Sequence, residues 1–505
     1  RELAGLEAVA KLPGYGEATP DTVDAILEEA SKFASEVLDP LNYSGDQQGS
    51  VWKDGAVTTP KGFKQAYQQY VQGGWGALPF DPEWGGQSLP KLVATAVEEM
   101  LTSSNMSFSL CPLLTQGAIH ALELCGTEAL KKTFLGKMIQ GSWTGTMNLT
   151  EPQAGSDLAL VRTKAERAGD HYRISGQKIF ITYGEHDLAE NIVHLVLART
   201  PDAPEGVKGI SLFLVPKFLP KPDGSPGERN SARCVSIEHK LGIHASPTAV
   251  MAYEDAVGYL VGEENKGLSY MFIMMNAARF SVGLEGVAIA ERAFQRALAY
   301  AKERLQGRDL EEGGGTVPII RHPDVRRMLM LMKSQTEAMR ALAYVVAAAL
   351  DSASRHPDKD TRAHNQAFAD LMIPVVKGWS TETGVEVASL GIQVHGGMGF
   401  IEETGAAQHL RDARITTIYE GTTGIQAGDL VGRKIARDGG TTAKAVIALW
   451  REFDAELARS GHPDVQAIRQ HFAAGVQAAQ EAVEYIVKEA DPRRAFSGAV
   501  PLLKL

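Results

Sequence analysis

Cysteine is scarce in this sequence, and the scarcity excludes two kinds of architecture. Three cysteines, Cys111, Cys125 and Cys234, occur in 505 residues, widely spaced and odd in number. No CxxC pair is present, so the sequence offers neither a disulfide framework nor a cysteine-based metal site. Unpaired cysteines suit a reducing compartment. We therefore expect a cytoplasmic protein without a bound metal.

Long apolar runs are absent as well. No stretch approaches the 18 uninterrupted apolar residues of a membrane-spanning helix, so we expect no membrane span. The first residues, Arg1 to Glu7, lack both the apolar core of a signal peptide and an Arg/Ser-rich transit pattern. The chain starts without Met and ends on the apolar Leu505, so we expect it to be trimmed at both ends.

Positive charge is also in short supply. The formal net charge is −10, from 51 Lys and Arg against 61 Asp and Glu. Proteins that bind the phosphate backbone of nucleic acids usually carry a basic domain. In residues 438–505, eight Lys/Arg and nine Asp/Glu give 8 − 9 = −1. We therefore expect no nucleic-acid partner.

Helical periodicity dominates the first part of the chain. From Thr22 onward, apolar residues recur at three-and-four spacing, which predicts one buried helical stripe: Val23, Ile26, Leu27, Ala30, Phe33, Val37 and Leu38. We expect this helix to end near Asp39, because the following Pro40 disfavours helical geometry there. A further helix is expected over Ala118 to Cys125. Residues 1–145 are thus predicted to form an N-terminal helical domain.

The pattern changes near Trp143 and changes back near residue 263. Short apolar or alternating segments separated by Gly, Pro and Asp predict a small central β domain over residues 146–262. It lacks the intervening helices of a Rossmann sheet. Long amphipathic helices then predict a C-terminal helical bundle over 263–437 and an additional helical segment over 438–505. The predicted fold class is α+β, mainly α.

Two short segments can carry chemistry. Tyr419-Glu420-Gly421-Thr422 places a carboxylate beside a glycine that permits close backbone approach, and Thr422 or Thr423 can cap a helix. On its own, this segment is better explained as a surface turn that carries a glutamate. The second is the strand Lys178 to Thr182, in which Phe180 and Thr182 are two apart and expected on one face, suited to a planar cofactor; an ordinary strand is the alternative.

Eight motifs in this order resemble the acyl-CoA dehydrogenase family across about residues 20–435. They are Trp84-Gly85-Gly86, Thr150-Glu151-Pro152-Gln153-Ala154-Gly155-Ser156-Asp157, Gly176-Gln177-Lys178 with Ile181-Thr182, Lys240-Leu241-Gly242-Ile243, Glu303-Arg304, Gln393 to Phe400, Arg411 to Arg414, and Tyr419 to Thr422. The resemblance implies an N-terminal helical domain, a central β domain and a C-terminal helical bundle, the same order that periodicity predicts.

The resemblance also implies a chemistry. It is the FAD-dependent α,β-dehydrogenation of an acyl-CoA thioester to the 2-enoyl-CoA, in which a carboxylate removes the α-proton and the flavin accepts the β-hydride. Glu420 matches that base in the medium- and short-chain members. Other members carry the base on a helix just before an arginine; here that position is Ala278, before Arg279, and alanine cannot take a proton. The base is therefore expected at Glu420.

The remaining site residues are carried over from the resemblance, position by position. Residues implied to bind FAD are Thr150, Phe180, Thr182, Arg304, Gln306, Gln393, Gly396, Gly397 and Thr422. Residues implied to bind the substrate are Ser156, Asn276, Arg279 and Gly421. Phe180 replaces a tryptophan of many relatives, and the aromatic residue usual after Glu303-Arg304 is missing. Both departures concern the details of FAD binding.

Several alternatives remain open at this stage. The segment Tyr419 to Gln426 and the helical tail resemble a bacterial subgroup that includes 3-(methylthio)propanoyl-CoA dehydrogenases of dimethylsulfoniopropionate degradation, alongside enzymes for other acyl chains. The family implies an electron-transfer flavoprotein as acceptor and a homodimer or homotetramer. An acyl-CoA oxidase using oxygen is the first alternative, and a DNA-binding protein on the same fold is the second.

Overall fold

The computed structural model describes residues 1–310 and 314–505, and these divide into two units. The mixed unit, with helices and the large sheet, comprises Glu17–Ser281 and Gly396–Asp412. The helical unit comprises Arg1–Gly16, Val282–His395 and Ala413–Leu505. The long helix α8 (Gly267–Glu303) contributes residues to both.

The mixed unit begins with helices and one hairpin. Their bounds are α2 Pro20–Lys32, a π-helix Phe33–Leu38, α3 Asp39–Gln48, β1 Val51–Lys53, β2 Ala56–Thr58, α4 Phe63–Gln72, α5 Lys91–Ser104, α6 Met106–Cys125 and α7 Glu128–Gln140. Short 3₁₀ turns cover Trp75–Ala77 and Pro82–Trp84. Asn105 caps α6 by accepting a hydrogen bond from the Phe108 amide at 3.1 Å.

The expected helix end at Asp39 is wrong. Asp39 adopts right-handed helical angles, φ −60° and ψ −43°, directly before Pro40. The chain passes from α2 through the wider π-helical turn Phe33–Leu38, and Pro40 then lies in the first turn of α3. A proline there replaces an N–H group that a helix start leaves unpaired. The helical stretch therefore runs on to Gln48.

A seven-stranded sheet forms the β part of the mixed unit, in the order β3-β6-β7-β11-β5-β4 with β10 paired to β11. The bounds are β3 Trp143–Asn148, β4 Lys164–Ala168, β5 His171–Thr182, β6 Asn191–Ala198, β7 Ser211–Pro216, β10 Ala232–Ile237 and β11 Thr248–Leu260. Only the β3–β6 pair in this sheet is parallel. Strands β8 (Phe218–Pro220) and β9 (Pro226–Arg229) pair separately. The expected strand Lys178 to Thr182 is the second part of the longer strand β5.

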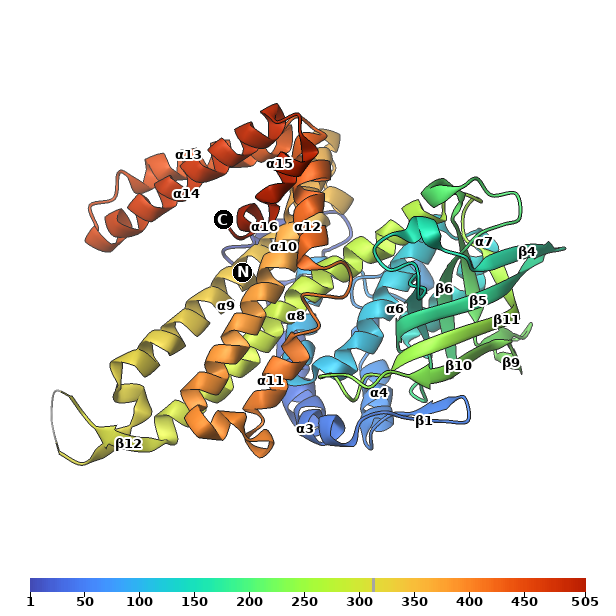
Figure 1. Ribbon diagram of the computed structural model, residues 1–505, viewed down its shortest axis with the longest axis horizontal. Coiled ribbons are helices and arrows are strands. Elements are labelled where there is room, and N and C mark those ends of the chain that lie inside the picture. Colours follow the sequence, from blue (N-terminus) through green and yellow to red (C-terminus); the bar gives the residue numbers. More distant parts are fainter. Residues whose placement is uncertain (311–313) are drawn as a thin grey trace. The chain divides into compact units, whose positions relative to one another are not determined.

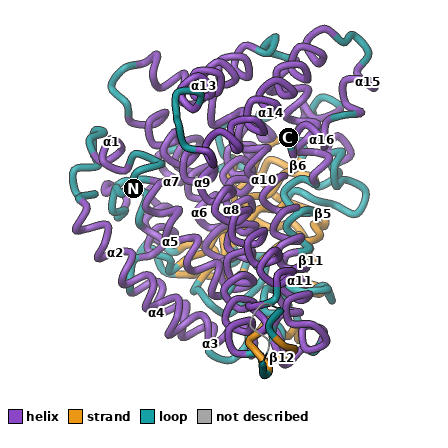
Figure 2. Tube along the Cα trace, turned by 90° about the vertical axis from the view of Figure 1, so that its left-hand side faces the viewer, coloured by secondary structure: helices purple, strands orange, loops and turns teal. Residues whose placement is uncertain are grey.

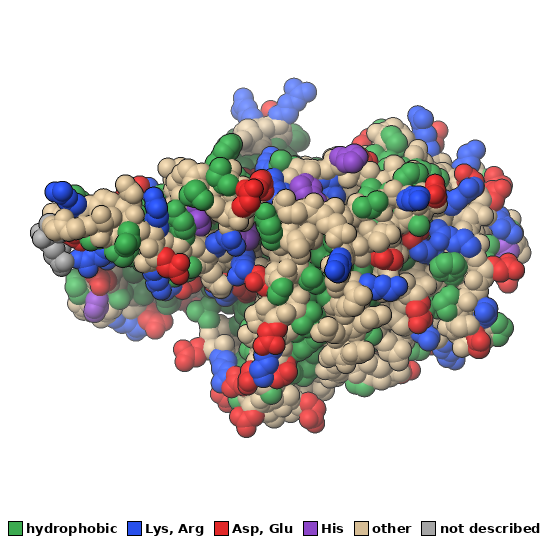
Figure 3. All heavy atoms as spheres, turned by 90° about the horizontal axis from the view of Figure 1, so that it is seen from below, with side chains coloured by type: hydrophobic (Ala, Val, Ile, Leu, Met, Phe, Trp, Pro, Cys, Tyr) green, Lys and Arg blue, Asp and Glu red, His purple; other side chains and the backbone are tan. Residues whose placement is uncertain are grey.

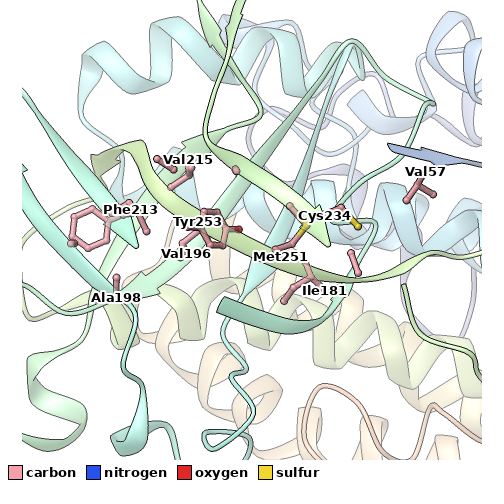
Figure 4. Packing of buried hydrophobic residues seen from close by; sticks show 14 residues of the cluster. Val57, Ile181, Val196, Ala198, Phe213, Val215, Cys234, Met251 and Tyr253 are labelled. Atoms are coloured by element: carbon pink, nitrogen blue, oxygen red, sulfur yellow. The ribbon is translucent and has the colours of Figure 1, made fainter. Parts of the chain in front are cut away.

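The core beneath this sheet is a cluster of buried apolar side chains (Figure 4). Ile181 from β5, Phe213 from β7 and Met251 from β11 converge there, and Val57 from β2 joins them. Residues alternating toward one face of each strand supply this packing. The core thus fixes β5, the strand that carries Phe180 and Thr182.

Two long neighbouring helices, α9 (Pro323–Arg355) and α10 (Lys359–His395), form the centre of the helical unit (Figure 1 and Figure 2). Pro323 begins α9, and two of the four methionines of this helix, Met332 and Met339, are fully buried core residues, whereas Met330 is 70% exposed. The other elements are α1 Leu6–Ala10, β12 Leu305–Arg308, β13 Thr316–Pro318, α12 Thr423–Asp429, a π-helix Leu430–Ala436, α13 Thr441–Leu457, α14 Pro463–Lys488, α15 Pro492–Ser497 and α16 Ala499–Lys504.

Helix α8 is unusually apolar in composition. Within the parts of the chain that the structure describes, it is the one helix long and apolar enough to cross a membrane. Of its most apolar window, 72% is buried inside the protein. A core helix has this combination of composition and burial.

Candidate active site

The segment Tyr419 to Thr423 forms a tight turn that leads into α12. Glu420 has φ +54° and Gly421 has φ +92°, so two successive residues occupy the left-handed region. Glycine adopts this region freely, whereas a glutamate there is uncommon and strained. Thr422 caps α12 by accepting a hydrogen bond from the Ile425 amide, which confirms the expected helix start. A strained, half-buried carboxylate is typical of a functional residue.

Side chains from α8 and α10 hold this turn. Tyr419 donates its hydroxyl hydrogen to Glu285 of α8. From α10, the Lys377 ammonium donates to the Gly421 carbonyl oxygen at 2.7 Å, and Glu382 Oε1 accepts the Thr423 hydroxyl hydrogen at 2.6 Å.

The buried amide of Gln426 completes these contacts from α12 itself. Its Nε2 donates to the carbonyl oxygens of Glu420 and Gly421, at 3.1 and 3.3 Å. Sequence reasoning missed these supporting residues. The available signal was Lys377, a lone cation among apolar residues in the middle of a helix expected to be buried.

Three of the residues implied to bind the flavin, Thr150, Phe180 and Thr182, lie in the mixed unit. The Ile179 amide donates to the Thr150 carbonyl oxygen at 2.9 Å, which fixes Thr150 beside β5. The pairing of β5 with β11 shifts register here: Lys178 pairs with Met251 and Ile181 with Ala249, leaving one extra residue on β5. Phe180, in this bulge, has φ +59° and is 59% exposed, while Thr182 is half-buried. The bulge breaks the strict alternation and presents the Phe180 ring outward.

A buried ion pair anchors the loop before this strand. Lys178 Nζ lies 2.8 Å from Glu151 Oε1 and also donates to the Leu149 carbonyl oxygen at 3.0 Å. The Glu151 carboxylate accepts further hydrogen bonds from the Arg162 and Thr163 amides.

The pKa values of this pair reflect two opposing effects. Burial raises the pKa of Glu151, but the Lys178 charge and the hydrogen bonds outweigh it and bring the pKa down to about 2. Burial lowers the pKa of Lys178 to about 8, against the opposing attraction of Glu151. Both groups are therefore charged at pH 7. The pair joins the Thr-Glu-Pro segment to the Gly-Gln-Lys segment.

Three of the four residues expected to contact the substrate lie in the mixed unit, at two places, and the fourth, Gly421, lies in the helical unit. Ser156 is exposed in the loop that follows Glu151. On α8, Arg279 Nη1 donates to Asn276 Oδ1 at 3.4 Å, and the guanidinium lies 5.8 Å from the Phe272 ring centre. Ala278 is buried, 2% exposed, and brings no ionisable group to this helix.

Five of the residues implied to bind FAD, which lie at the ends of α8 and α10, are all exposed. Arg304 Nη2 donates to the Gln306 side-chain oxygen at 3.4 Å, where α8 passes into β12. Gln393, near the end of α10, and the 3₁₀ residues Gly396 and Gly397 are also exposed. Beside them in the sequence, Phe400 is 84% exposed.

These groups suit a flavin nucleotide in their chemistry. The exposed Phe180 ring offers a stacking surface, and the Thr150 and Thr182 hydroxyls lie on backbone segments joined by the Ile179 hydrogen bond. The Arg304 guanidinium matches a pyrophosphate through its planar set of donors. The structure thus gathers Thr150, Phe180 and Thr182 within one unit and Glu420, Gly421 and Thr422 within the other.

The charged surface shows no strong basic character on the face drawn in Figure 3. Lys and Arg side chains alternate there with Asp and Glu side chains. Nucleic-acid binding by electrostatics needs a clustered basic footprint. This distribution gives the DNA-binding alternative no support.

Comparison with known families covers most of the chain. Residues 20–142 match the family model described as acyl-CoA dehydrogenase, N-terminal domain. Residues 146–256 match the corresponding middle domain, and residues 265–435 the corresponding C-terminal domain.

Individual relatives give the same picture. The chain is 54% identical over 501 residues to the 3-methylmercaptopropionyl-CoA dehydrogenase of Ruegeria pomeroyi, covering 98% of this chain and 85% of that protein. The structure resembles butyryl-CoA dehydrogenase from Megasphaera elsdenii with a TM-score of 0.65 and 26% identity, over 82% of this chain and 98% of that one. The fold of Bd2924 in its apo form matches 100% of this chain and 97% of that one, with a TM-score of 0.72 at 21% identity.

Proposed function

This chain belongs to the acyl-CoA dehydrogenase family and dehydrogenates an acyl-CoA to the enoyl-CoA, and we propose that Glu420 is the base that removes the α-proton. The observation that supports Glu420 most is its left-handed backbone at a turn held by two helices. Ala278, at the other position where the family carries its base, has no group that accepts a proton. The family resemblance, the turn geometry and the alanine at the alternative position together support Glu420 as the base.

The site must also stabilise the charge that develops when the α-proton leaves. A thioester α-proton is weakly acidic, so donors have to strengthen their hydrogen bonds as the carbonyl oxygen becomes an enolate. The resemblance implies the Glu420 amide as one such donor. A Cβ on Gly421 would lie 2.7 Å from Gln426 Nε2, so glycine at this position lets the Gln426 amide reach the carbonyl oxygens that hold the turn. A carboxylate shielded from water is also a stronger base.

We assign FAD as the cofactor. When bound, its flavin supplies the acceptor for the β-hydride. Phe180 would pack against the ring, and Thr150 and Thr182 would form hydrogen bonds at its polar edge. Thr422, at the α12 cap, would contact the FAD of the same subunit. The pyrophosphate and adenine of a neighbouring subunit's FAD would be held by Arg304, Gln306, Gln393, Gly396 and Gly397. Such sharing requires at least a homodimer, and either a dimer or a tetramer satisfies this.

For the substrate we propose 3-(methylthio)propanoyl-CoA, the compound that the name of the 54%-identical relative indicates for that protein. Ser156 binds the CoA portion, and Asn276, Arg279 and Gly421 line the thioester site. The electrons then pass to an electron-transfer flavoprotein in the cytoplasm. Rapid peroxide release in air after anaerobic reduction by substrate would instead identify an oxidase.

A panel of acyl-CoA thioesters with an artificial electron acceptor tests both parts of this proposal. We expect the highest kcat/KM with 3-(methylthio)propanoyl-CoA, compared with butanoyl-, hexanoyl- and octanoyl-CoA. Glu420→Gln should lose about 10²- to 10⁴-fold in kcat, the usual worth of a general base, while FAD stays bound. Retained turnover in Glu420→Gln would remove the base assignment. A preference for another acyl chain would change only the substrate.

A further inference from the structure

The turn around Glu420 is held at every second residue. Tyr419 is bonded to Glu285, Gly421 to Lys377 and Thr423 to Glu382, so each partner lies on a helix outside the turn. Glu420 stands between the first two of these contacts. Three charged side chains from α8 and α10 therefore support the turn that carries the proposed base.

Lys377 is the least expected of the three. Its side chain is fully buried, 0% exposed, in the middle of α10. Removing an ammonium from water is costly, so a buried lysine persists where its hydrogen bonds are needed. Its Nζ lies 2.7 Å from the Gly421 carbonyl oxygen, a strong charge-assisted hydrogen bond. The next residue, Gly378, fits under Leu503 of α16: a Cβ there would lie 2.7 Å from the leucine Cδ1.

This contact controls the orientation of one peptide group. The Glu420 carbonyl is held by Gln426 Nε2, and the Gly421 carbonyl is held by both Gln426 and Lys377. Gly421 is the residue whose backbone turns most easily, because it lacks a Cβ. Glu420 has a strained φ of +54°, and it relaxes more readily once Gly421, the residue that follows it, is free to turn.

We propose that Lys377 is a positioning residue for the catalytic base. Its ammonium locks the Gly421 peptide, and the locked peptide keeps Glu420 in the left-handed conformation that directs its carboxylate. Lys377 itself takes no proton and touches no reacting atom in this assignment. The inference rests on the proposed role of Glu420 and adds the group that keeps it aligned.

The test replaces Lys377 by Met, a neutral side chain of similar length, in the FAD-loaded enzyme. A displacement of about 1 Å in a reacting group can cost about 100-fold in rate, so we expect kcat to fall about 100-fold. KM should change by no more than about 3-fold, because substrate contacts remain. Exchange of the substrate α-hydrogen with D₂O, followed by NMR, should slow by the same factor as kcat. Lys359→Met, at the exposed start of α10, is the matched control and should behave as wild type.

Lys377→Gln separates positioning from folding, since its amide can still donate while the buried charge is gone. We expect it to recover about 10-fold of the loss in kcat, with the melting temperature unchanged relative to Lys377→Met. A kcat within about 3-fold of wild type in folded Lys377→Met would overturn the proposal. Failure of both variants to fold would also overturn it, because Lys377 would then be structural. Active Glu420→Gln would instead disprove the base, whichever way Lys377 behaves.

Discussion

Glu420 and Phe180 invite comparison because each is a non-glycine residue held in the left-handed region, at φ +54° and +59°. Glu420 lies in a turn of the helical unit, supported by side chains from α8 and α10. Phe180 lies in a bulge of a strand, supported by the backbone ladder with β11 and by the buried pair Glu151–Lys178 nearby. Both side chains thus extend from a strained backbone. Side chains from other helices hold that backbone at Glu420, whereas strand pairing holds it at Phe180.

Two buried lysines, Lys178 and Lys377, accordingly have different roles. Lys178 neutralises a carboxylate within the mixed unit and ties two chain segments together. Lys377 binds a carbonyl oxygen of the turn that carries the proposed base. Loss of the first should therefore lower stability, whereas loss of the second should lower turnover.

The largest effect on stability is expected from Lys178→Met. This change leaves the Glu151 carboxylate buried without its cation, which typically costs 3–5 kcal/mol, so we expect about 3 kcal/mol or more in the free energy of unfolding. Denaturant unfolding measures it, with the exposed Lys164→Met as control. The double variant Glu151→Gln/Lys178→Met should regain part of the loss. A loss of less than about 1 kcal/mol in the free energy of unfolding would contradict the stabilising role of Lys178.

The stability that the Glu151–Lys178 ion pair contributes should depend on pH in the acidic range. The pKa of Glu151 is lowered from its ordinary value of 4.5 to about 2 in the folded protein. A group with a lowered folded pKa stabilises above its unfolded pKa, and that contribution is lost as the pH falls from about 4.5 toward 2. The contribution is on the order of 3 kcal/mol at most. Melting temperatures of wild type should fall more steeply over this window than those of Glu151→Gln/Lys178→Met; parallel curves would contradict the assignment.

The smallest effect is expected from Phe180→Gly. A stacked aromatic pair contributes about 0.5–1.5 kcal/mol, so loss of the ring should weaken FAD binding about 5-fold. Glycine accepts a positive φ without strain, so the melting temperature of the FAD-free protein should stay the same or rise slightly. Fluorescence titration of FAD and thermal unfolding measure the two quantities. Phe180→Trp keeps a stacking ring and should bind FAD as well as wild type does.

The order of helical, β and helical regions could be predicted from periodicity alone. Individual helix bounds were harder, and proline was the main reason. Pro40 was expected to end a helix, but a π-helical turn ahead of it lets the helical run continue. Helix α6 was expected from Ala118, whereas it starts at Met106 and contains Pro112. Such prolines are tolerated where tertiary packing outweighs the lost hydrogen bond.

The chemistry of the site could be predicted from the sequence. The residues and strand pairing that hold the site residues in place could not. Glu420, Phe180 and Thr150 were identified through motifs, and their roles remain predictions. The positive φ of Phe180 could not be foreseen, because it depends on the register between β5 and β11. Lys377 could not be linked to Gly421 either, since 44 residues separate them and only packing brings them together.

The left-handed backbone at Glu420 also narrows the paths open to mutation. A single nucleotide change in a glutamate codon leads to aspartate, glutamine, lysine, glycine, alanine or valine. Among these, glycine and aspartate tolerate a positive φ best, while valine, with its branched Cβ, is the worst suited. Only aspartate keeps a carboxylate, one methylene shorter. Aspartate is therefore the one substitution, among those reached by a single nucleotide change, that suits this backbone conformation and also retains a base.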